Sequence, residues 1–338
     1  MEDTIIKIQD IDFYWETENP FIFCVHHNDQ FPKGNEHQEV DAPLYGRNLG
    51  NDFSRKQGFS MYHGTTVPGF PAHPHRGFET VTIVLKGFID HHDSYGAQGR
   101  YGNGDVQWLT TGKGCMHSEM FPLVNIERDN PCELFQIWLN LPAKDKFAEP
   151  HFKMLWAEDI PKITISDSNN KKISVNIISG EFNNVKSLAS PPSSWASVPN
   201  NKVGIFLIDM EPDSSITLPK ISDTLIRNLY FYSGDDVVII DNNQINSNKR
   251  IKLQGDKEVT IRNGNRQSLL LLLEAEPINE NVVQYGPFVM NTEEEIRKAY
   301  SDYRETGFGG WKWDRHDPVN ERESGRFAKL SDGRTEQR

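Results

Sequence analysis

Short apolar or alternating runs, separated by turn residues, fill the chain from its N-terminus to about Pro277. The turn residues recur about every eight to twelve positions, which is the spacing typical of an all-β domain. Representative runs are ETVTIVLKG, DVQWLTTG, ELFQIWLNL, KVGIFLIDM and SLLLLLEAE. Few windows show a helical period, so we expect antiparallel sheets rather than alternating helices and strands.

One window, NTEEEIRKAYSDY, is the exception and predicts a helix near the C-terminus. Thr292 and Glu295 have the spacing of a capping box, in which each side chain bonds the other residue's backbone amide. Apolar residues then recur on one helical face: Ile296, Ala299, Tyr300 and Tyr303. The tail that follows mixes both charge signs with Gly and Arg, so we expect an irregular segment docked by Trp311 and Trp313.

The composition changes near the middle of the chain. The stretches SDSNNKKISV and NNVKSLASPPSSWASVPNNK are rich in Asn, Ser, Lys and Pro, which suits loops and a linker. We therefore expect a domain boundary between Pro142 and Asn201. Histidine use changes as well, because all but one of the 11 histidines lie at or before His151 and the remaining one is His316. Any histidine chemistry is expected in the first half.

Composition and charge narrow the possible classes of protein. The 338 residues are enough for two ordinary domains, and the apolar runs are too short to cross a bilayer. A net charge of −12 opposes direct binding to nucleic acid. The N-terminus lacks the apolar region of a secretion signal, so we expect a cytoplasmic protein. Cys24, Cys115 and Cys132 have no CxxC spacing, which favours reduced thiols over disulfides or a zinc knuckle.

Two pairs of potential metal ligands are the strongest chemical signal. In HPHRGFETVT, His73 and His75 project from one face if the chain is extended, and Pro74 disfavours a helix there. In TGKGCMHSEM, His117 and Glu119 have the same spacing. Isolated histidines are commonly surface or hydrogen-bonded core residues. Two such pairs beside glycines and strand-like runs nevertheless favour a metal site over that alternative.

The ligand types restrict the metal without identifying it. Three imidazoles and one carboxylate suit Fe, Mn, Ni, Cu or Zn better than Mg or Ca, which prefer oxygen ligands. A six-coordinate ion would keep two positions for water, substrate or dioxygen. If one strand continues beyond His75, then Glu79, Val81 and Ile83 lie on the histidine side, and Glu79 could orient a ligand imidazole.

Other polar residues have simpler interpretations. The run His91 to Ser94 could suggest a hydrolase triad, but adjacent strand residues face opposite ways. We expect Asp93 and Ser94 to cap backbone amides of the following turn instead. Cys115 is expected to be a small buried hydrophobic residue.

The same residues carry a family resemblance. HPHRGFETVT and HHDSYGAQGRYGNGDVQWLTTGKGCMHSE resemble the signature of the pirin family of the cupin superfamily, and YGPFVMNTEEEI resembles its C-terminal signature. The segment GGWKWDRHDPVN resembles an extension of some bacterial pirin-like proteins. The resemblance implies an all-β bicupin of two antiparallel, jelly-roll-like barrels with a short C-terminal helix and an irregular tail. It implies metal ligands at His73, His75, His117 and Glu119.

The resemblance also implies a division of the chain into four parts. A metal-binding barrel is expected in residues 1–142 and a connecting region in residues 143–202. A second barrel without metal ligands is expected in residues 203–290, and the helix and polar tail in residues 291–338. The lack of any histidine between His151 and His316 agrees with an empty second barrel.

Two functions are compatible with this resemblance. The first is a metal-dependent dioxygenase of the quercetin 2,3-dioxygenase type, with Fe(II), a flavonol-like or other enolic substrate, dioxygen, and Glu119 as proton acceptor. The second is a non-catalytic regulator that binds a protein partner and responds to the redox state of its metal. A metal-binding protein without turnover is a third alternative. We expect a monomer, because two barrels of one chain already cover each other's faces, and no membrane partner.

Overall fold

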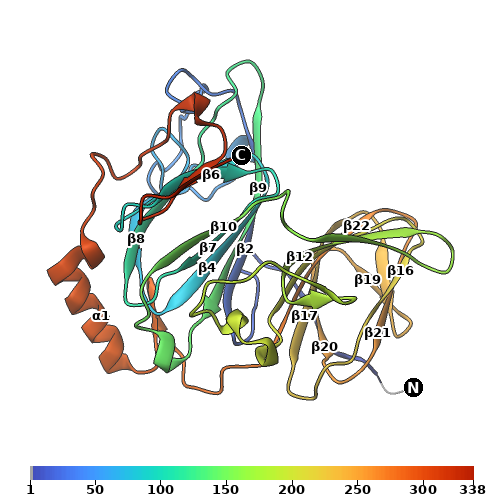
Figure 1. The fold of residues 1–338 in the computed structure, drawn as a ribbon. Coiled ribbons are helices and arrows are strands. Elements are labelled where there is room, and N and C mark those ends of the chain that lie inside the picture. Colours follow the sequence, from blue (N-terminus) through green and yellow to red (C-terminus); the bar gives the residue numbers. More distant parts are fainter. Residues whose placement is uncertain (1–2) are drawn as a thin grey trace. The chain divides into compact units, whose positions relative to one another are not determined.

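Antiparallel strands build two compact units within the chain (Figure 1). The structure is a computed structural model that describes residues 3–338. The first, here called the histidine unit, comprises Val25–Ala157 and Glu280–Arg338. The other, here called the second unit, comprises Glu158–Asn279 and the described residues up to Cys24. No helix in residues 3–338 is long and apolar enough to cross a membrane.

Two sheets form most of the histidine unit. The strands of the five-stranded sheet, in spatial order, are β10 (His151–Leu155), β7 (Val106–Thr110), β4 (Phe78–Lys86), β9 (Asn130–Asn140) and β2 (Phe21–Phe31). Those of the six-stranded sheet are β26 (Thr335–Gln337), β25 (Phe327–Lys329), β6 (Gln98–Gly102), β5 (Phe88–Asp93), β8 (Cys115–Met120) and β3 (Gly69–His75). Buried apolar residues of both sheets join in one core cluster, which includes Val84, Ile89, Tyr101, Leu109 and Leu134.

The second unit repeats this two-sheet design. Its seven-stranded sheet, in spatial order, contains β1 (Ile5–Asp10), β20 (Lys249–Gln254), β17 (Ile226–Gly234), β22 (Ser268–Ala275), β15 (Gly204–Met210), β12 (Lys172–Ser179) and β11 (Lys162–Ser166). Its four-stranded sheet contains β16 (Ser215–Leu218), β21 (Val259–Asn263), β18 (Val237–Ile240) and β19 (Asn243–Asn246). A short hairpin pairs β13 (Glu181–Phe182) with β14 (Val185–Lys186). Apolar side chains from both sheets, mostly aliphatic with some phenylalanines, fill the core.

The compact units do not follow the predicted boundaries. Strand β1, expected in the first barrel of residues 1–142, pairs along its length with β20 and so belongs to the second unit. The segment Glu280–Arg338 joins the histidine unit. It contributes the hairpin of β23 (Val283–Tyr285) and β24 (Phe288–Met290) and the helix α1 (Glu293–Thr306). The predicted and observed boundaries differ because strands distant in sequence pair with each other. The composition of the chain does not reveal such pairing.

Helix α1 confirms the predicted capping box. The Thr292 hydroxyl accepts the backbone N–H of Glu295, whose carboxylate in turn accepts the backbone N–H of Thr292. The predicted apolar face is also present, since Ile296 and Ala299 are buried. The helix appears in orange at the lower left of Figure 1.

The tail after α1 is more ordered than expected. Strand β25 pairs with β6 and with β26, so the tail extends the six-stranded sheet. The Trp313 indole N–H donates to the Asp93 carbonyl at 2.9 Å, which confirms a docking role for this residue. The Trp311 indole instead donates to Arg315 within the tail itself.

Gly77 breaks the run HPHRGFETVT into two strands of different sheets. It lies between β3 and β4 with φ +87°, and a Cβ atom there would approach the Val289 carbonyl oxygen to 2.0 Å. Side-chain parity therefore does not continue from His75 into β4. The prediction that Glu79 lies on the histidine side was wrong, and Thr82, of the opposite parity, lies there instead.

Candidate metal centre

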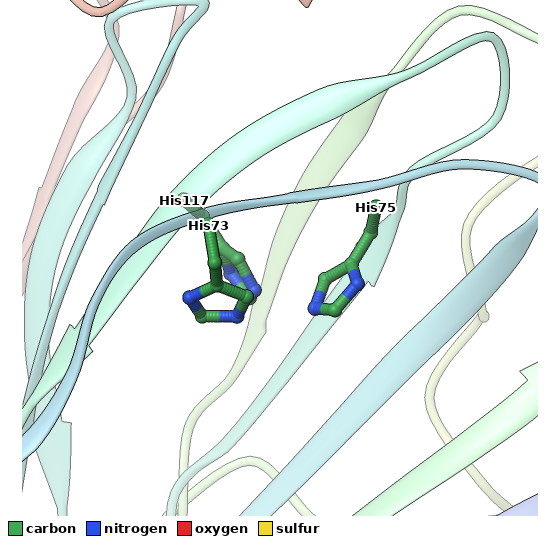
Figure 2. Close-up of side chains that lie close together, drawn as sticks. All are labelled: His73, His75 and His117. Carbon is green, nitrogen blue, oxygen red and sulfur yellow. The ribbon is translucent and has the colours of Figure 1, made fainter. Parts of the chain in front are cut away.

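The three predicted histidine ligands meet on one face of the β3–β8 pair. His73 lies directly opposite His117, and His75 lies opposite Cys115 two positions along. Residues directly opposite each other in antiparallel strands place their side chains on the same face. Potential ligand atoms of the three histidines all lie within 4.8 Å of one another. Figure 2 shows the three imidazole rings gathered around a common space.

Backbone carbonyls orient two of these rings. His73 Nδ1 lies 2.9 Å from the Pro71 oxygen, and His75 Nδ1 lies 3.4 Å from the Pro287 oxygen. A carbonyl oxygen only accepts, so each Nδ1 must carry the proton and each Nε2 keeps its lone pair. Metal-binding histidines commonly show this arrangement, because the outer hydrogen bond determines the tautomer.

His117 is the ring that most needs a partner. It is fully buried, and neither ring nitrogen has a hydrogen-bond partner among the described residues. Its Nε2 lies 3.8 Å from the nearer oxygen of Glu119, which is beyond hydrogen-bond distance. Unpaired buried polar atoms are unfavourable, so the cluster fits a ligand that accepts imidazole lone pairs.

Burial keeps the three histidines neutral. It lowers the pKa of His73 to about 4, and it lowers the pKa values of His75 and His117 well below the usual value for an imidazole. Positive charge on neighbouring histidines acts in the same direction. Neutral imidazole is the form that coordinates a metal, so the cluster is ready to bind without first losing protons.

Glu119 lies beside the histidines rather than within their tight group. Its Oε1 accepts the Thr82 hydroxyl at 3.0 Å, and its Oε2 accepts the Gln136 side-chain amide at 3.4 Å. Burial raises the pKa of Glu119, while His91 and these two hydrogen bonds oppose the rise. The arrangement offers a carboxylate next to three imidazoles, held by neutral donors.

Sequence reasoning missed three contributors to this site. Thr82 was overlooked because strand parity pointed to Glu79, and the role of the Pro287 carbonyl depends on contacts between distant segments. Gln136 had a visible signal, because it is a polar residue inside the apolar run ELFQIWLNL. The Thr82 hydroxyl also lies 2.6 Å from the Gln136 side-chain oxygen, so the two residues lie together beside Glu119.

Asp93 has the structural role predicted for it. Its Oδ1 accepts the backbone N–H groups of Tyr95 and Ala97, each at 2.9 Å, and so caps the turn. His91 Nε2 lies 3.4 Å from Asp93 Oδ2, and its ring lies 5.4 Å from that of His117. Cys24, Cys115 and Cys132 are all unbridged, and Cys115 is buried as predicted.

Helix α1 and the segment before it support strand β3, which carries His73 and His75. Arg76, next to His75, donates to Asp302 of α1 at 2.8 Å and to the Lys113 carbonyl at 2.6 Å. The Val289 backbone N–H donates to the Arg76 carbonyl at 3.0 Å. The segment that resembles the C-terminal family signature therefore supports the end of β3 from which His75 projects.

Known proteins resemble the chain in sequence. The family model described as pirin matches residues 19–139, and the model of the pirin C-terminal cupin domain matches residues 205–309. A pirin-like protein of Solanum lycopersicum is 36% identical over 79% of this chain and 87% of its own length. A Pseudomonas aeruginosa protein named "Putative quercetin 2,3-dioxygenase PA3240" is 34% identical over 71% of this chain and 80% of its own.

A solved structure has the same fold. The crystal structure of quercetin 2,3-dioxygenase from Acinetobacter baumannii matches with a TM-score of 0.71 and 23% identity. The match covers 92% of this chain and 99% of that one. Together with the antiparallel sheets of Figure 1, this likeness confirms the predicted all-β bicupin fold.

Proposed function

Because the chain belongs to the pirin family, we propose that it is a metal-dependent dioxygenase that acts on flavonol-like or other enolic substrates. The observation that carries this proposal is the convergence of His73, His75 and His117, with both ring nitrogens of buried His117 unpaired among the described residues. The name of the Pseudomonas aeruginosa relative supports the reaction type.

We propose that the three histidines and Glu119 hold one divalent ion, and that this ion is Fe(II). Imidazole with carboxylate suits Fe, and the same residues can also accept Mn, Ni, Cu or Zn. When bound, such an ion supplies a Lewis acid that lowers the pKa of a substrate hydroxyl.

Glu119 is proposed to take up the substrate's proton. Its carboxylate lies beside the histidine cluster, and burial raises its pKa towards the range in which a carboxylate accepts a proton readily. Thr82 and Gln136 would hold the carboxylate in place throughout, because each is positioned to donate a hydrogen bond to it. The proposed partners are an enolic substrate and dioxygen. We further propose that the protein is a monomer in the cytoplasm.

Metal analysis and oxygen uptake test this function. The purified chain is expected to contain close to one divalent ion, and adding quercetin anaerobically and then oxygen should cause oxygen uptake. His73→Ala should lose both the ion and the uptake, whereas Glu119→Gln should slow uptake more than it lowers metal content. His37→Ala is the matched control, because His37 is an exposed histidine outside the cluster.

Two results would count against the proposal. Full oxygen uptake by the His73→Ala variant would mean that the histidine cluster is not the site of the reaction. Metal binding without uptake of oxygen for quercetin or another enol would favour the regulator, which predicts that oxidising the metal changes which proteins the chain retains in a pull-down.

A further inference from the structure

A buried ion pair interrupts the apolar core of the second unit. Arg227 of β17 lies directly opposite Glu274 of β22, and its Nε donates to Glu274 Oε2 at 2.6 Å. The neighbouring inward positions on the same two strands are apolar and belong to the core cluster: Leu229, Phe231, Leu270 and Leu272. Arg227 is completely buried and Glu274 is 6% exposed. Such a pair is weak evidence for stability by itself, so its position needs another reason.

A cavity of about 670 Å³ lies beside this pair, within the second unit. Glu274 is part of its lining, together with residues from the end of β12, the β13–β14 hairpin, the following linker and the start of β15. Its volume is in the range of small-molecule sites, roughly 300–1,000 Å³. The cavity therefore combines enough room for a ligand with one buried carboxylate.

Gly204 leaves space around that carboxylate. A Cβ atom at this position would lie 2.8 Å from Glu274 Cγ and 2.4 Å from the Phe206 ring. Any larger residue would have to displace one of these side chains. The glycine thus allows the Glu274 side chain to occupy its place at the cavity.

The hydrogen bonds of Glu274 indicate what the cavity can recognise. Arg227 holds Oε2, and no described residue donates a hydrogen bond to the other oxygen, Oε1. A carboxylate oxygen is an acceptor, so a ligand must bring a donor. Because Arg227 already balances the charge of Glu274, a neutral hydroxyl fits better than a second cation. The rest of the lining mixes polar and apolar residues, and its apolar members, which include Leu188, Val203, Phe206 and Ile221, suit an apolar body.

We propose that this cavity binds a small molecule carrying a hydroxyl group on an apolar body, with the hydroxyl donating to Glu274 Oε1. The site is separate from the histidine cluster, and it does not depend on the function proposed for that cluster.

Saturation-transfer NMR with two matched probes tests the proposal on the full chain. The probes are 4-ethylphenol and 4-ethylanisole, which differ in that the ether has no hydroxyl donor. The phenol should bind about tenfold more tightly than the ether, since a hydrogen bond to a charged group is lost in the ether. Equal binding of the two probes, or no binding of either, would overturn the proposal.

Three variants locate the bound probe. The double change Arg227→Leu/Glu274→Leu removes both charges together, which avoids a lone buried ion, and should abolish the preference for the phenol. The Ala196→Trp variant keeps the ion pair but adds a large side chain to the cavity lining, so it should weaken the binding of both probes. The His73→Ala variant should bind both probes as the wild type does. If phenol binding is lost in His73→Ala and kept in the double variant, the probe occupies the histidine cluster and the proposal is wrong.

Discussion

At the scale of single residues, the buried ion pair of Arg100 and Asp90 in the histidine unit is stabilised by several further hydrogen bonds. The Arg100 guanidinium makes two hydrogen bonds of 2.7 Å to the Asp90 carboxylate. It also donates to the Gln38 side chain and to backbone carbonyls of the tail, including that of Asn320. Arg100 and Asp90 are 1% and 0% exposed. Removing one member of such a pair leaves the other charge unpaired in the interior.

Arg100→Met is therefore expected to lower the free energy of unfolding by about 3–5 kcal/mol. Urea unfolding measures the change. Arg334→Met is the matched control, because the Arg334–Asp332 pair is exposed and should contribute less than about 1 kcal/mol. Similar losses in the two variants would contradict a special role for the buried pair.

His27 is another buried residue whose protonation is linked to stability. Tyr62 donates its hydroxyl to Asp29 at 2.6 Å, so His27 Nδ1, 2.8 Å from that hydroxyl, acts as the donor to it. Burial, with a smaller contribution from His26 and Arg55, lowers the pKa of His27 to about 3. An unfolded histidine has its ordinary value of about 6.5. The unfolded chain therefore binds the proton first as the pH falls, and stability present above pH 6.5 is lost progressively down to about pH 3.

Between pH 7 and pH 5, the free energy of unfolding is expected to fall by about 2 kcal/mol more in the wild type than in the His27→Gln variant. Glutamine can still donate to Tyr62 but does not titrate, which isolates the imidazole's contribution. Urea unfolding at the two pH values gives the comparison. Parallel pH dependence in the two proteins would mean that His27 is not held neutral in the folded state.

At the scale of elements, helix α1 begins at a capping box that is visible in the sequence, and it contacts the residue next to His75 in the candidate metal centre. The capping box fixes where the helix begins, and Asp302 within the helix accepts a hydrogen bond from Arg76. Phe288, Met290 and Phe308 pack with the buried face of α1 in a separate cluster. The helix thus holds the chain next to His75 through both an ion pair and packing.

Thr292→Ala should lower the free energy of unfolding by about 1 kcal/mol, because the Glu295 backbone N–H loses its acceptor. Urea unfolding is again the measurement. Ser301→Ala, at an exposed position inside the same helix, should cause no loss, since alanine is the better helix former. A loss in the serine variant equal to that in the threonine variant would argue against the cap as the cause.

At the scale of the whole molecule, the tail completes the histidine unit. Asn320 donates its backbone N–H to Asp90 at 2.7 Å and its side-chain amide to the Gly99 carbonyl at 3.1 Å. The Ala72 backbone N–H, next to His73, donates to the His316 carbonyl at 2.7 Å. The tail therefore supplies hydrogen-bond partners both to the buried Asp90 carboxylate and to strand β3 next to His73.

Deleting residues 311–338 is expected to lower the free energy of unfolding by about 3 kcal/mol or more, because Asp90, Arg100 and the edge of β6 lose partners. A shorter deletion, of residues 333–338, keeps Asn320 and β25, so it should lower the free energy of unfolding much less. Urea unfolding of both deletions decides whether the tail is part of the folded unit. Wild-type stability of the longer deletion would show that it is not.

Local patterns in the sequence were sufficient for several features of this fold. Strand-like runs predicted an all-β protein, and the capping box predicted where α1 begins. The spacing of His73 and His75, with His117, identified the residues that the structure gathers. These features are encoded by neighbouring residues, because strand parity and helix capping act over only a few positions.

Only the tertiary structure decided how distant segments meet. Gly77 turns the chain between two sheets, so Thr82 rather than Glu79 lies near the cluster. The pairing of β1 with β20 and of β25 with β6 set the unit boundaries. The Pro287 carbonyl reached His75 from 212 positions away. The sequence by itself determined which side chains could bind a metal. Their partners depended on long-range backbone pairing, for which a linear pattern of residue types carries no distance information.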